Sequence, residues 1–125
     1  MVKIRVYYED TDAGGIVYHS NYINFCERAR SEHFFSRGMN PHLDNGSFVV
    51  RRIECDYLAP SKLGDLLEVK TKILEIKNTS LVLEQSVYKQ ENLLFIAKIV
   101  LVFVEDLKPA KIPPQMKELF KTFDL

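Results

Sequence analysis

The order of the apolar patterns along the chain is its most restrictive feature. A single long helical pattern is followed by four strand-like runs. From Tyr22 to about Phe35, apolar side chains recur at helical spacing, whereas the segment from Val2 to Tyr8 alternates as a half-buried strand does. A length of 125 residues allows one domain with a real core. The pattern therefore predicts an α+β fold in which residues 1–125 form a single domain.

The four later runs are predicted strands, and they end at turn-forming residues. They span Phe48 to Leu58, Leu66 to Lys77, Leu81 to Lys89 and Leu93 to Val104, and a short amphipathic segment follows from Gln115 to Phe123. The fourth run is almost unbroken apolar sequence, which is typical of a central strand covered on both faces. Because one long helix cannot cover both faces of such a sheet, we expect a second subunit to cover the other face.

Composition excludes several classes of protein. Lys plus Arg equals Asp plus Glu at 17 each, so the chain has no net positive charge that would favour binding to nucleic acid or to an anionic membrane. The chain has neither an apolar signal segment nor an apolar run of membrane-spanning length, and we expect a cytoplasmic protein. Cys26 and Cys55 lack metal-ligand spacing, and we interpret both as small buried hydrophobes rather than a disulfide or a nucleophile.

Chemistry-bearing residues gather between the first strand and the helix. Asp10 and Asp12 stand in an acidic loop, Gly14 and Gly15 follow, and Ser20 is a candidate N-cap of a helix that ends near Gly38. A helix start presents unpaired N–H groups, and a carboxylate beside such donors is suited to acyl transfer. The same residues also suit an ordinary turn between a strand and a helix, so spacing alone leaves both interpretations open.

The run from Tyr8 to Arg30 favours the acyl-transfer interpretation by resemblance. It has the form Tyr-x-Asp-Thr-Asp-x-x-Gly-x-Val-Tyr-His, then Tyr-x-x-Phe-x-Glu-x-Ala-Arg. This resembles the signature of hotdog-fold acyl-CoA thioesterases, in particular the 4-hydroxybenzoyl-CoA thioesterase family and its YbgC-like branch from the bacterial Tol-Pal gene cluster. A weaker likeness continues through Asp56-Tyr57-x-x-Pro60-x-x-x-Gly64-Asp65 and the strands after it.

The resemblance implies a fold and an assembly. The fold is the hotdog fold, a five-stranded, mainly antiparallel sheet wrapped round one long helix. The active unit would be a homodimer with sites at the subunit interface, and the resemblance points further to a dimer of dimers, a homotetramer.

The resemblance also assigns roles to residues. Asp12 would be the catalytic carboxylate, acting as nucleophile or as general base on water, and backbone N–H groups near His19 would hold the oxyanion. His19 itself would be the second catalytic residue, which hydrogen-bonds the substrate or holds Asp12 in place, and its alternative role is to brace the loop. Asp10 would brace the loop through backbone N–H groups. Glu27 is a rival carboxylate, but we expect it to pair with an Arg.

Two further sets of residues are expected to contact the substrate. The acyl group would be bound by Tyr8, Gly15, Val17 and Tyr18, although core packing explains the tyrosines as well. Coenzyme A carries phosphates, so basic groups should line the mouth of the pocket. The candidates by position are Arg51, Arg52 and Lys62, although most such residues are simply solvated.

The predicted function is hydrolysis of acyl-CoA to free acid and coenzyme A in lipid metabolism, with no metal or redox cofactor. Two alternatives remain open. One is an enoyl-CoA hydratase on the same fold, although Asn40-Pro41-His42 matches the hydratase motif incompletely and is interpreted as a turn. The other is a non-catalytic protein that binds acyl-CoA or acyl carrier protein and contacts envelope or phospholipid-synthesis proteins.

Overall fold

A computed structural model describes residues 1–123 of the chain. Its elements are β1 (Val2–Arg5), the 3₁₀ helix η1 (Tyr8–Asp10), α1 (His19–Phe35), β2 (Gly46–Tyr57), β3 (Leu66–Ile76), β4 (Ser80–Lys89), β5 (Asn92–Glu105), β6 (Lys108–Pro109) and α2 (Pro114–Phe120).

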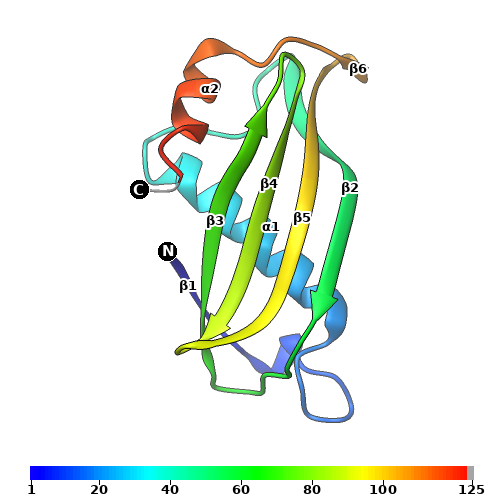
Figure 1. Cartoon of the computed structure of the whole chain (residues 1–125), viewed down its shortest axis with the longest axis vertical. Coiled ribbons are helices and arrows are strands. Elements are labelled where there is room, and N and C mark those ends of the chain that lie inside the picture. Colours follow the sequence, from blue (N-terminus) through cyan, green and yellow to red (C-terminus); the bar gives the residue numbers. More distant parts are fainter. Residues whose placement is uncertain (124–125) are drawn as a thin grey trace.

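All strand pairs are antiparallel, in the order β1-β3-β4-β5-β2, and the two-residue strand β6 pairs with β5. Figure 1 shows α1 crossing one face of this sheet, while the opposite face carries no helix within residues 1–123. The predicted α+β arrangement, a sheet wrapped round one long helix, is confirmed. The helices of the described chain include none that is long and apolar enough to cross a membrane.

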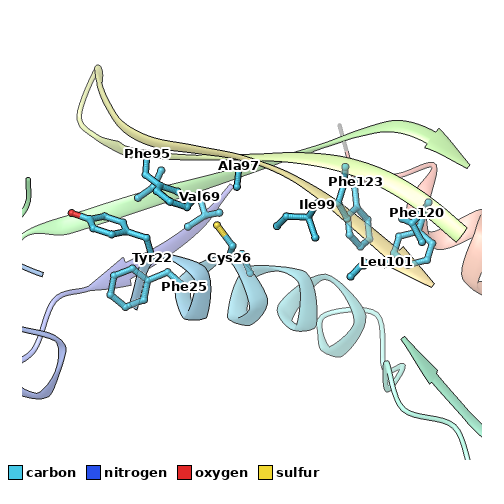
Figure 2. Packing of buried hydrophobic residues seen from close by; sticks show 14 of the residues in the cluster. Tyr22, Phe25, Cys26, Val69, Phe95, Ala97, Ile99, Leu101, Phe120 and Phe123 are labelled. Atoms are coloured by element: carbon cyan, nitrogen blue, oxygen red, sulfur yellow. The ribbon is translucent and has the colours of Figure 1, made fainter. Parts of the chain in front are cut away.

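The core lies between α1 and the covered face of the sheet. Figure 2 shows Tyr22 and Cys26 of α1 directed toward the sheet, where Phe95 and Ala97 of β5 lie. The rings of Tyr22 and Phe95 stack with their centroids 5.3 Å apart. Phe25, Cys26, Ala29, Phe34 and their neighbours on the sheet are almost fully shielded from solvent. The helical stripe expected from the sequence is therefore the buried face of α1.

One polar network crosses this core. Arg30 Nη1 donates to Gln85 Oε1 over 2.8 Å. Gln85 Nε2 in turn donates to the backbone carbonyl of Cys26 at 2.9 Å and to Thr71 Oγ1 at 3.0 Å. The side chains of Arg30, Gln85 and Thr71 are buried, so their hydrogen bonds replace those that water would make.

The strand β2 forms one edge of the sheet. It pairs with β5 on one side, and within residues 1–123 no strand lies on its other side. Its register shifts between Val50 and Arg52, which identifies a β-bulge. The residues that pair with core-facing residues of β5 are therefore Phe48 and Val50 before the bulge and Ile53, Cys55 and Tyr57 after it.

Several predicted boundaries were wrong by a few residues. The first strand ends at Arg5 rather than Tyr8, because the chain turns into η1. The helix begins at His19, and its N-cap is Tyr18 rather than Ser20. It ends at Phe35, after which Gly38 adopts a φ of +70°. The strand β6 was not predicted, because two residues are too few for a periodic pattern.

Candidate active site

A tight loop joins β1 to α1. After η1 the chain reverses on itself, and Thr11 and Val17 form an antiparallel bridge across the loop. The backbone N–H of Asp12 donates to the carbonyl of Ile16 at 2.8 Å, and the N–H of Gly15 donates to the carbonyl of Asp12 at 3.0 Å. The glycine takes a φ of +86°, which only glycine adopts without strain. The reversal returns the chain from Asp12 to the start of α1.

Asp10 braces this loop, as the sequence predicted. Its carboxylate is buried, and Oδ2 accepts the backbone N–H of Tyr7 at 2.9 Å. Its carbonyl accepts two further hydrogen bonds, from the backbone N–H of Tyr18 at 2.8 Å and from Asn21 Nδ2 at 2.9 Å. Asp10 therefore ties the loop to the first turn of α1.

The carboxylate of Asp12 is exposed and is oriented by its own loop. Its Oδ1 accepts the backbone N–H of Gly14 at 2.8 Å and, at 3.4 Å, that of Ile16. Within residues 1–123, Oδ2 has no hydrogen-bond partner. One oxygen thus fixes the side chain, while the other is available to a ligand.

The start of α1 leaves hydrogen-bond donors open. The N–H of Asn21 donates to the carbonyl of Tyr18 at 2.8 Å. The N–H groups of His19 and Ser20 precede the first intrahelical bonds and have no backbone acceptor in the described part of the chain. Two adjacent donors at the positive end of a helix are suited to a developing oxyanion.

An apolar cavity of about 300 Å³ adjoins this helix start. It is lined by Ile16, Val17, His19, Tyr22, Tyr57, Leu58, Ala59 and Pro60. Val17 and His19, two of the site residues expected from the sequence, thus line this cavity. Tyr57 and the segment 58–60 were missed as lining residues, although Asp56-Tyr57-x-x-Pro60 had been noted as part of the resemblance.

Other residues expected to bind the acyl group lie outside the cavity lining. Tyr8 is 82% exposed, because η1 directs the chain away from β1. The ring of Tyr18 is about half exposed and lies with its centroid 4.5 Å from that of His19. Gly15 is at the tip of the loop. In the isolated chain, only Val17 of that set lines the cavity.

The basic residues expected to bind coenzyme A are divided between two places. Lys62 forms an isolated bridge with Ile16 and so lies beside the cavity. Arg52 pairs with Val100 and lies on the opposite face of the sheet from Tyr57, five residues or about 16 Å along β2. Its side chain forms an ion pair with Glu54 at 2.7 Å. Arg51 is exposed at the bulge.

Two rival motifs take structural roles. Glu27 Oε1 accepts a hydrogen bond from Ser31 Oγ at 2.9 Å. The expected ion pair with an Arg is absent within residues 1–123. Asn40 Oδ1 accepts the backbone N–H of His42 at 2.9 Å, which confirms the predicted turn.

Among the residues that the structure describes, no cluster of three or more His, Cys, Asp or Glu side chains has the arrangement of a metal site.

Residues 14–96, more than half of the chain, match the thioesterase superfamily. The chain belongs to this superfamily. Its similarity to the acyl-CoA thioesterase YbgC of Helicobacter pylori is 42% identity, over 94% of this chain and 97% of that protein.

Solved structures of thioesterases agree with this assignment. A probable thioesterase from Bartonella henselae has a TM-score of 0.84 and 33% identity, over 90% of this chain and 97% of that one. A thioesterase from Thermus thermophilus, complexed with coenzyme A and zinc, has a TM-score of 0.81 and 28% identity, over 98% and 92% of the two chains. The sheet and helix of this chain therefore have the hotdog arrangement of the thioesterase fold.

Proposed function

We propose that the protein is an acyl-CoA thioesterase that hydrolyses the thioester bond to a free acid and coenzyme A. The observation that carries the proposal is that three parts belong to the loop and helix start of α1. These are the carboxylate of Asp12, the open N–H groups of His19 and Ser20, and an apolar cavity beside them. Asp12 itself is not among the cavity-lining residues and joins them through its hydrogen bond to Ile16, which is one of them. The YbgC relative is named for the same activity.

In the proposed reaction, the thioester carbonyl oxygen accepts the N–H groups at the start of α1. Charge that develops on this oxygen is stabilised by donors that are already oriented, so little reorganisation is needed. Asp12 Oδ2 either attacks the carbonyl carbon or removes a proton from an attacking water. Collapse of the tetrahedral intermediate breaks the C–S bond. If Asp12 acts as base, the thiolate of coenzyme A takes up the proton that Asp12 removed from water, and the free acid is released directly. If Asp12 attacks, the product of this step is an acyl anhydride of Asp12, and one water then hydrolyses it to the free acid and supplies the proton of the thiol.

The lining of the cavity supports the proposal that it binds the acyl group of the substrate and that this group is uncharged. This lining contains no Asp, Glu, Lys or Arg, and burial of apolar acyl surface there is favourable. Lys62 lies beside the cavity and would contact the phosphates of coenzyme A. Coenzyme A is part of the substrate, and no further cofactor is proposed.

Assembly of the active enzyme forms part of the proposal. The free edge of β2 is twelve residues long, and an exposed edge of this length is a template for pairing with a second chain. A homodimer joined at this edge would bring Arg51 to the interface, and the dimers would pair to a homotetramer.

The two free cysteines support a reducing, cytoplasmic location. Acyl carrier protein, or envelope or phospholipid-synthesis proteins, are the proposed partners, and the resemblance to the YbgC-like branch is their support.

A panel of acyl-CoA and acyl-carrier-protein thioesters, with aromatic, short and long acyl groups, tests the proposal through the release of free thiol. We expect thiol release from at least one acyl-CoA. Absorbance of the double bond of an enoyl-CoA, followed in the same samples, detects hydration instead. Binding of acyl-CoA without thiol release or hydration across the panel would reject the enzyme and favour a binding protein.

A further inference from the structure

The last residue of β2 is tied to the first residue of α1. Tyr57 Oη donates to the backbone carbonyl of His19 over 2.9 Å, although the two residues are 38 positions apart in the sequence. The ring of Tyr57 packs edge-on against His19 and Tyr22, with centroid distances of 6.2 and 5.9 Å, and lies 5.1 Å from Phe95. The aromatic contacts thus hold the phenol beside the start of the helix.

Other ties to this end of α1 come from loops. Asp10 accepts hydrogen bonds from Tyr18 and Asn21, and Ser61 accepts the backbone N–H of Val17 at 2.8 Å. The hydroxyl of Tyr57 differs from these ties because it comes from the edge strand and contacts the carbonyl of the first residue of the helix. Tyr57 also lines the cavity.

We propose that Tyr57 is a positioning residue for thioester hydrolysis, and that its hydroxyl orients and polarises the peptide unit whose N–H holds the oxyanion. The carbonyl of His19 and the N–H of Ser20 belong to one planar peptide group. A donor at the carbonyl oxygen fixes the plane of this group. It also draws electron density from the nitrogen, which strengthens the N–H as a donor. This inference rests on the proposed hydrolase function.

The phenol is protonated under the conditions in which it must donate. Burial, together with the neighbouring Cys55, raises the pKa of Tyr57 above its usual value of 10.0. A raised pKa keeps the hydroxyl neutral throughout the neutral range, so its hydrogen bond to His19 persists there.

The substitution Tyr57→Phe tests the proposal, because it removes the hydroxyl and keeps the ring. Loss of a whole oxyanion donor costs about 10²–10³-fold in kcat, and weakening of one donor should therefore cost less, about tenfold. We expect KM, and the affinity for an S-alkyl thioether of coenzyme A that has no carbonyl oxygen, to remain at wild-type values. In ¹⁵N-resolved spectra the amide proton of Ser20 should move upfield.

Tyr88→Phe is the matched control, since Tyr88 lies on β4 with its ring 5.2 Å from the Lys70 ammonium and makes no contact with the cavity. It should leave kcat and the Ser20 amide shift unchanged. If the wild type is active and the kcat of Tyr57→Phe equals that of the wild type, the role of Tyr57 is overturned and the hydrolase proposal stands. Equal loss of thioether affinity and kcat would indicate a general packing defect and would also overturn this role. A wild type without thiol release would overturn the hydrolase proposal and this inference together.

Discussion

Arg30 donates a hydrogen bond to Gln85 across the core, from the C-terminal half of α1 to the centre of β4, over 2.8 Å. The Arg30 side chain is only 9% exposed, and no ion pair with a carboxylate accompanies it within residues 1–123. Burial lowers the pKa of Arg30 below its usual range. A buried cation whose acceptor is a neutral amide depends strongly on that acceptor.

Replacement of Gln85 by Leu should therefore destabilise the protein by about 2–4 kcal/mol, because it leaves the guanidinium of Arg30 and the hydroxyl of Thr71 without their partner. Urea denaturation measures the free energy of unfolding. Gln115→Leu on the exposed side of α2 is the control, with an expected change within about 0.5 kcal/mol. A Gln85→Leu protein as stable as the wild type would mean that the core adapts to the unpaired cation.

Substitution of Asp12 by Asn should lower kcat by about 10²–10⁴-fold, because the amide neither attacks the thioester nor removes a proton from water. The amide oxygen still accepts the N–H of Gly14, so the loop and the affinity for coenzyme A thioesters should be retained. Steady-state thiol release and calorimetric binding measure the two quantities. Asp44→Asn, in an exposed turn, should leave both at wild-type values. Full turnover in Asp12→Asn would move the chemistry to another group.

The ionisation of Asp65 is expected to make the free energy of unfolding depend on pH. Burial alone would raise its pKa, but the hydrogen bond from the Lys62 N–H at 2.9 Å and the contact with Lys89 Nζ at 3.0 Å outweigh burial and lower the pKa below 3.8. The stability gained from this carboxylate is therefore complete above pH 3.8 and is lost as the pH falls through the lower pKa of the folded state.

The variant Asp65→Asn measures this contribution. We expect it to be less stable than the wild type by roughly 1–2 kcal/mol at neutral pH, since hydrogen bonds to a charged group are lost. The difference should shrink when urea denaturation is repeated in increasingly acidic buffer. A difference that stays constant with pH would show that the charge of Asp65 contributes nothing.

Cys26 should resist alkylation. Burial raises the pKa of its thiol to about 12, so at mildly alkaline pH almost none of it is the reactive thiolate. Iodoacetamide followed by mass spectrometry should modify the partly exposed Cys55 first, and both cysteines only after unfolding in urea. Rapid labelling of Cys26 in the native protein would imply that α1 opens readily from the sheet.

Local patterns were sufficient to predict most of the fold. The β-strands β2 to β5 lie within two residues of the predicted runs, because their apolar side chains face a continuous core. The start of α1 was less predictable. Ser20 has the side chain of an N-cap, but Tyr18 occupies that position because its N–H is held by the carbonyl of Asp10. A backbone hydrogen bond of this kind does not depend on the side chain, so the residue type at position 18 does not reveal it.

The candidate site was predicted only in part for a similar reason. Asp12 and His19 stand within eight positions of each other, so a local motif includes both. Tyr57 reaches His19 from the last residue of β2, and only the folded chain brings them together. The exposure of Tyr8 was also unpredictable, because it depends on the turn into η1 rather than on alternation.

The bulge in β2 has a consequence for variation in chain length. In a regular strand, loss of one residue reverses the direction of every side chain beyond it. At Arg51 the register already contains one residue more than β5 opposes, so deletion of that codon would leave the pairing of Ile53 and Tyr57 intact. Deletion between Ile53 and Tyr57 would instead turn the phenol of Tyr57 away from α1. Natural length variants of this strand are therefore expected to differ at Arg51.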